Sequence, residues 1–130
     1  MKIELPYPSH ELHAHNNGNW RHKSKPTQAA RTLAKFICLD MINRNEIRPI
    51  AGRVLISYAI FVPDNRPRDT CNILQALKPS IDGVVDSGLV EGDNWQAMTV
   101  YKVAVQIDRK NPRVEITLNS TNGNGDFMAK

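Results

Sequence analysis

The run RVLISYAIFV, from Arg53 to Val62, decides the fold. β-Branched and aromatic residues dominate it, and neither glycine nor proline interrupts it before Pro63. A stretch that is apolar at successive positions is typical of a strand covered on both faces, which places it in the middle of a sheet. We expect the remaining elements to assemble around this central strand.

Two elements are expected before the central strand. Lys2 to Leu5 predicts a short edge strand closed by Pro6. After a long polar loop from Ser9 to Lys25, Pro26 suits the first position of a helix. Apolar residues then recur at helical spacing to about Arg44, namely Ala29, Ala30, Leu33, Ala34, Ile37 and Met41.

After the central strand, Asp69 or Thr70 can cap a second helix. Pro79 either kinks this helix or begins another one. Alternating apolar residues over 101–107 and 114–118, joined by a turn at 109–112, predict an antiparallel hairpin. The apolar side of the second helix would consist of Ile73, Leu74, Leu77, Ile81, Val84 and Val85.

The order β-α-β-α-β-β predicts one small α+β domain, in which two helices cover a mixed β-sheet. With 130 residues, 41% of them hydrophobic, the chain suits a single domain over residues 1–118. The polar residues 119–130 are expected to form a disordered tail.

Composition excludes several classes of protein. The apolar runs are too short to cross a bilayer, and the N-terminus lacks a signal pattern, so we expect a cytoplasmic protein without a membrane partner. Cys38 and Cys71 have no CxxC spacing, which predicts reduced thiols rather than a disulfide scaffold or zinc finger. His10, His13 and His15 have no acid or cysteine at ligand spacing.

Charge is distributed unevenly along the chain. Residues 20–70 hold ten Lys and Arg against four Asp and Glu, whereas residues 71–108 hold two against five. A phosphate-binding surface beside an acidic metal pocket would produce this asymmetry. Two unrelated solvated faces would produce it as well.

The stretch from Arg66 to Asp93 contains the candidate chemistry. Lys78, Asp82 and Asp86 recur at intervals of four, and in a continuous helix they would form one polar stripe with Gln75 and Cys71. By itself this spacing fits a surface ion pair as well as a catalytic pair. Gly92-Asp93-Asn94 likewise fits a simple turn.

The order of three motifs is more specific. RPRDTCN at 66–72, KPSIDG at 78–83 and GLVEGD at 88–93 together resemble the RusA family of Holliday-junction resolvases. That family's signature is Asp-x-Asp-Asn, a lysine, an Asp-Ala/Gly-Leu-like helix and a terminal Asp-Asp. Asn-x-x-Trp-Arg at 17–21 is similar to the family's early loop. The resemblance covers roughly residues 1–118, and its specific part is 66–93.

The resemblance implies a homodimeric endonuclease of DNA recombination and repair, in the cytoplasm of a bacterium or a phage-infected bacterium. It would grip a four-way junction or other branched DNA and nick two strands symmetrically with Mg²⁺ or Mn²⁺. Asp69, Asp82 and Asp93 would bind the metal, and Lys78 would complete the catalytic set beside the scissile phosphate. The residues expected to contact DNA are Asn17, Trp20, Arg21, Lys23, Arg66, Arg68 and Asn72.

Two positions depart from the family's signature. Cys71 stands where the second aspartate is usual, and Gly92 stands where the first of the paired aspartates is usual. A thiol is a poor ligand for Mg²⁺, although Asp86 or Glu91 could replace the lost carboxylates. Three hypotheses follow: an active resolvase, a branched-DNA-binding protein of the same fold with weak or no cleavage, and a protein adaptor that ignores DNA shape and salt.

Overall fold

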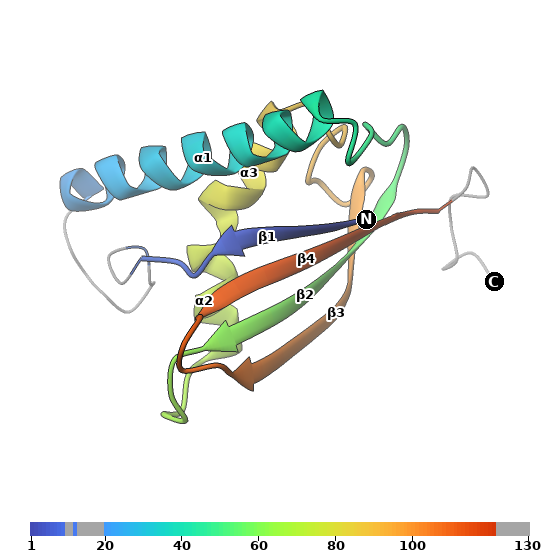
Figure 1. Cartoon of the computed structure of the whole chain (residues 1–130). Helices are drawn as coiled ribbons and strands as arrows, with labels where there is room; N and C mark the ends of the chain where they lie inside the picture. Colours follow the sequence, from blue (N-terminus) through green and yellow to red (C-terminus); the bar gives the residue numbers. More distant parts are fainter. Residues whose placement is uncertain (10–11, 13–19, 122–130) are drawn as a thin grey trace.

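A computed structural model describes residues 1–9, 12 and 20–121, with the backbone alone for residues 20–24 (Figure 1). Four strands form one mixed sheet in the order β1-β4-β2-β3. The strands are β1 (Lys2–Pro6), β2 (Val54–Val62), β3 (Met98–Ile107) and β4 (Arg113–Ser120). The helices are α1 (Trp20–Asn43), α2 (Thr70–Ala76) and α3 (Lys78–Asp86). The α+β class with a mixed sheet is therefore confirmed.

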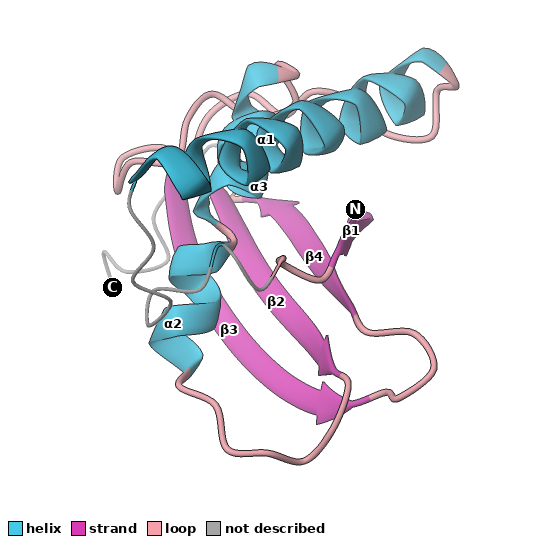
Figure 2. Ribbon diagram, turned by 90° about the vertical axis from the view of Figure 1, so that its left-hand side faces the viewer, coloured by secondary structure: helices cyan, strands magenta, loops and turns pink. Residues whose placement is uncertain are grey.

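Strand β2 is central, as its sequence predicts. It runs antiparallel to β4 and parallel to β3, while β1 pairs only with β4 and forms one edge. The predicted coverage of both faces is wrong, because only alternate residues of β2, from Val54 to Val62, are buried. The helices lie on that face, as Figure 2 shows. On the other face Phe61 is half-buried beneath the guanidinium of Arg113, 3.8 Å from the ring centroid.

The predicted β3–β4 hairpin is also wrong. β4 lies between β1 and β2, and β3 pairs with the opposite side of β2. Strand spacing explains why a short connection suffices, since crossing one strand requires about 10 Å and five extended residues reach about 17 Å. The crossing passes close to the end of β2, where the Asp108 amide donates to the Val62 carbonyl at 2.9 Å. The apolar residues of β4 (Val114, Ile116 and Leu118) thereby become fully buried.

Helix α1 begins earlier than the sequence predicts. It starts at Trp20, so Pro26 lies inside the helix rather than at its first position, and residues 20–25 are not part of the preceding loop. No glycine or proline lies between Gly18 and Pro26, so the backbone can enter the helix before the proline. Pro26 removes one backbone donor from the helix but leaves the remaining turns intact.

The region around Pro79 forms two helices rather than one kinked helix. Asp69 is the N-cap of α2, and its side chain accepts a hydrogen bond from the Cys71 amide. Buried Leu77 ends α2 and begins α3, with Pro79 in the first turn of α3. The polar stripe expected for one continuous helix is therefore divided between two helices. α2 carries Cys71 and Gln75, and α3 carries Lys78, Asp82 and Asp86.

Helices α1 and α3 cross at a point where their backbones approach closely. A Cβ added at Gly83 would lie 2.1 Å from the Arg31 carbonyl oxygen and 2.9 Å from the Ala34 Cβ. Only a residue without a side chain fits this crossing. Beneath the helices the core includes Ile3, Ile56, Leu89 and Ile116. No helix among the described residues has the length and apolar character needed to span a bilayer.

Candidate functional site

Lys78 joins two carboxylates that come from different elements. Its ammonium group is at the start of α3 and donates to Asp82 Oδ1 at 2.5 Å, one turn further along the same helix. It also donates to Asp93 Oδ2, in the loop that precedes β3. We call these three residues the Lys78 cluster. It remains open to solvent, since 59% of the Lys78 side chain and about a third of each carboxylate side chain (28% and 32%) are exposed.

The loop that carries Asp93 is held at several points. Leu89 and Val90 are buried in the core, and the Leu89 carbonyl accepts from the Ile50 amide at 2.8 Å. The Gly52 amide donates to Glu91 Oε2 at 2.9 Å. These contacts tie the loop to the segment that leads into β2. The position of Asp93 opposite Lys78 is therefore a product of the core.

Charge in the Lys78 cluster favours the ionised forms. Hydrogen bonds from the Lys78 ammonium to Asp82 and then Asp93 raise the pKa of Lys78. The same ammonium lowers the pKa of Asp93, against the opposing effect of partial burial. These shifts keep Lys78 positive and Asp93 negative at neutral pH. Two carboxylates around one ammonium group suit a cation or a cation-bound phosphate.

Tyr58, which the sequence reasoning missed, lies within electrostatic range of this cluster. It is on the helix-covered face of β2 and only 8% of its surface is exposed. Burial, and secondly the charge of Asp93, raise the pKa of its phenol to about 12. The phenol therefore stays neutral at physiological pH. The sequence could have indicated its burial, because alternation along the central strand places Tyr58 on the same face as Ile56 and Ile60.

Asp69 lies at the start of α2, where its Oδ1 accepts from the Cys71 amide at 2.8 Å. Within the described residues no hydrogen bond or ion pair connects it to Asp82 or Asp93. Asn72 is half-buried in the first turn of the same helix, and Cys71 is an exposed free thiol. The structure therefore brings Asp82 and Asp93 together through Lys78, and gives Asp69 a separate role as a helix cap.

The two acids considered as replacements have other partners. Asp86 forms a bidentate pair with Arg31 of α1, at 2.6 and 2.9 Å. That contact lowers the pKa of Asp86 and links α3 to α1. Glu91 accepts from the Gly52 amide. Neither acid joins the Lys78 cluster.

The candidate DNA contacts fall in two regions. In the loop after β2, Asp64 binds both arginines: Arg66 Nε at 3.2 Å and Arg68 at 2.8 Å. Arg68 also donates to two carbonyls of its own loop, so it stabilises that loop, whereas 78% of the Arg66 side chain is exposed and can reach a phosphate. Trp20, Arg21 and Lys23 are in the first turns of α1, with side chains outside the described part. Asn17 and the three loop histidines also lie outside the described residues.

The oxygen donors of the cluster suit a hydrated divalent cation. No three His, Cys, Asp or Glu side chains gather as a metal site within residues 1–9, 12 and 20–121. Mg²⁺, however, commonly uses one or two carboxylates and completes its shell with waters and substrate phosphates. Asp82 and Asp93 can serve as that pair. Lys78 binds the same oxygens, so a metal would compete with its ammonium group.

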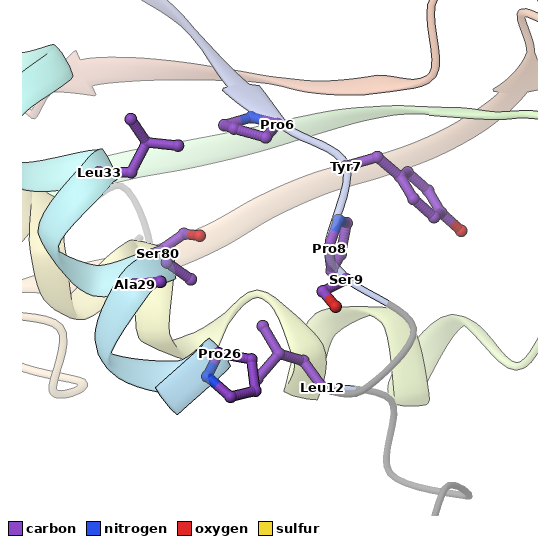
Figure 3. A pocket seen from close by; sticks show the side chains of 10 residues that line it. Pro6, Tyr7, Pro8, Ser9, Leu12, Pro26, Ala29, Leu33 and Ser80 are labelled. Carbon is purple, nitrogen blue, oxygen red and sulfur yellow. The ribbon is translucent and has the colours of Figure 1, made fainter. Parts of the chain in front are cut away.

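A separate cavity of about 300 Å³ lies between the segment after β1, helix α1 and the start of α3 (Figure 3). Pro6, Pro8, Leu12, Pro26 and Leu33 make most of its lining apolar, and Ser80 supplies a hydroxyl. None of its lining residues is charged. It is not the place where the acidic residues meet.

Comparison with known proteins shows a distant relative. No protein-family model matches the chain. An uncharacterized protein of Xylella fastidiosa (strain Temecula1 / ATCC 700964) is 26% identical over 87 residues, which cover 67% of this chain and 57% of that protein. The chain thus matches little more than half the length of that relative.

Proposed function

We propose that this protein is a metal-dependent endonuclease of branched DNA that resolves four-way junctions as the RusA family does. The observation that carries the proposal is the Lys78 cluster: two carboxylates from separate elements meet around one ammonium group. A nuclease needs carboxylates that converge and a cation near the scissile phosphate. The motif order in residues 66–93 supports the same activity.

Each residue of the candidate site has its own role in the proposed reaction. Asp82 and Asp93 would hold Mg²⁺ or Mn²⁺, and Asp69 would contribute from the start of α2. The bound ion would supply charge stabilisation at the phosphate and an activated water. Lys78 exchanges a carboxylate for a phosphate oxygen and neutralises the developing charge. Symmetric nicking of a junction requires two such sites, which a homodimer supplies.

The test is cleavage of a labelled four-way junction beside a linear duplex of matched sequence, with Mg²⁺ and separately with Mn²⁺. We expect paired symmetric nicks in the junction alone. Asp93→Asn should lose nicking at least about 100-fold, since removing one charge-stabilising group commonly costs 10²–10³ in rate, and should still bind the junction. Asp108→Asn is the matched control, because Asp108 pairs with Arg113 outside the cluster. Native nicking by Asp93→Asn would refute the assignment.

A second candidate is a branched-DNA-binding protein that has lost turnover. The exposed thiol of Cys71 at the usual aspartate position, and a cluster with only two carboxylates, favour it. This function would be established if the protein bound the junction without metal and made no nicks with Mg²⁺ or Mn²⁺. A protein adaptor would bind neither the junction nor the linear duplex, at any ionic strength.

A further inference from the structure

Trp95 is the most exposed large apolar side chain among the described residues, with 75% of its surface accessible. It lies in the loop that precedes β3, two residues after Asp93. An indole left in water has surface that a ligand can cover with a gain in free energy. Its position next to the candidate site makes it a candidate contact for whatever that site binds.

The turn that carries Trp95 is held by a set of hydrogen bonds. Asn94 Oδ1 accepts from the amides of Gln96 and Ala97, at 2.9 and 3.1 Å. The Asn94 carbonyl accepts from the amides of Ala97 and Met98, at 3.0 and 2.9 Å. Arg53 Nε donates to the Gln96 carbonyl at 3.3 Å. The backbone is thus ordered before any ligand binds, and less entropy is lost on binding.

The neighbours of Trp95 argue against a protein partner. Asp93, Asn94 and Gln96 are all exposed and polar or charged. Exposed apolar side chains occur further along β3, at Val100, Tyr101, Val105 and Ile107. Within its own turn, however, Trp95 is flanked by polar residues, unlike the apolar centre of a protein interface. A flat aromatic group with cations nearby, here Lys78 and Arg53, is instead the arrangement that proteins use to stack unpaired nucleobases.

Chain geometry fixes how far such a base can be from the cluster. Two residues span at most about 7 Å between Cα atoms, and successive stacked bases are about 3.4 Å apart. Because both side chains extend beyond their Cα atoms, a base on Trp95 and a phosphate at the Lys78 cluster would belong to the same few nucleotides around one branch point. Paired bases of a duplex present no free face, whereas a branch point can.

We propose that Trp95 stacks on an unpaired nucleobase at the branch point and so selects branched over linear DNA. This inference rests on the proposed function. Trp95 would be a specificity-determining residue that lies outside the motifs of residues 66–93.

Fluorescence and affinity measured on the same protein test the inference. The chain has two tryptophans, Trp20 and Trp95, so the difference in emission between the wild type and Trp95→Phe reports Trp95. We expect a four-way junction, but not matched duplex, to quench that difference without metal. Trp95→Ala should weaken junction binding about 5- to 150-fold, and Trp95→Phe should restore most of it. Duplex affinity should be unchanged. Phe36→Ala is the control, since Phe36 is an exposed aromatic residue of α1.

Each other outcome has a definite meaning. If the wild type binds the junction without a change in Trp95 emission, and Trp95→Ala binds it as tightly as the wild type, this inference is overturned and the proposed function stands. Failure of the wild type to bind the junction overturns both. A change in sedimentation of Trp95→Ala would assign Trp95 to self-association and overturn the stacking role.

Discussion

At the residue scale, one ammonium group governs the candidate site. Lys78 contacts Asp82 and Asp93 together, so the like charges of the carboxylates are offset by a single cation. Because all three side chains are partly exposed, solvent screens their attraction, and the cluster contributes little to stability. A phosphate or a metal can therefore exchange into it at low cost. This availability suits a binding or catalytic role better than a structural one.

Acid stability provides a test of the Lys78–Asp93 contact. The folded pKa of Asp93 is lowered, so its ionised form stabilises the fold above the unfolded pKa of about 3.9, and that contribution is lost as the pH falls through the folded pKa. Lys78→Met removes the cause of the shift. We expect the free energy of unfolding to decline less on acidification below pH ~4 in Lys78→Met than in wild type. Urea unfolding measures this, and equal declines would contradict the contact.

Two substitutions separate the structural and chemical roles of Asp69. Asp69→Ala removes the cap of α2 and should lower the free energy of unfolding by about 1 kcal/mol, whereas Asp69→Asn keeps the cap. If Asp69 is also a metal ligand, Asp69→Asn should cleave junctions poorly despite its native stability. Urea unfolding and the nicking assay provide the two readouts. Native cleavage by Asp69→Asn would leave Asp69 with the cap alone.

At the element scale, the crossing of α1 and α3 determines where the Lys78 cluster lies. Gly83 follows Asp82 directly, and the absence of a side chain lets α3 approach the Arg31 carbonyl. Arg31 and Asp86 add a bidentate pair across the same interface. The glycine of the Asp82-Gly83 motif is therefore explained by helix packing, while the aspartate beside it faces the cluster.

Gly83→Ala should destabilise the protein by about 1–3 kcal/mol, because the new Cβ would meet a backbone oxygen at 2.1 Å. The sign of the change in unfolding free energy tests the close crossing, because replacing glycine by alanine within a helix ordinarily stabilises a protein by about 0.5–1 kcal/mol. Gly92→Ala is the control: its Cβ would meet nothing closer than 3.5 Å, so stability should change by less than about 0.5 kcal/mol. Thermal denaturation distinguishes the two. A stabilised Gly83→Ala would contradict the close crossing.

At the scale of the whole molecule, the three motifs of residues 66–93 fall on the start of α2, on α3 and on the loop before β3, and the last two meet in the Lys78 cluster. The two positions that depart from the family's signature lie on the first and last of these elements. Cys71 is exposed, and Gly92 has space for a side chain. Replacing both by aspartate tests whether the site is limited by its missing carboxylates.

Cys71→Asp combined with Gly92→Asp should raise metal affinity and increase nicking by about tenfold or more, since each added carboxylate is a hard oxygen donor. Thermal shift on adding Mg²⁺ or Mn²⁺ reports binding, and the junction assay reports cleavage. The matched control is Cys71→Asn with Gly92→Asn, which has nearly the same shape without charge. Equal metal responses of the two double variants would show that these positions do not face the site.

Local patterns in the sequence determined the central strand and the β1 edge and limited the helix cap to Asp69 or Thr70, and the motif resemblance singled out Asp82 and Asp93. Each depends on residues within a few positions of one another, or on one motif. Only the tertiary structure decided that β4 lies between β1 and β2, that Asp86 pairs with Arg31, and that Tyr58 is buried within electrostatic range of Asp93. These arrangements depend on which surface each distant element buries. Hydrophobic periodicity within one element does not identify the element that packs against it.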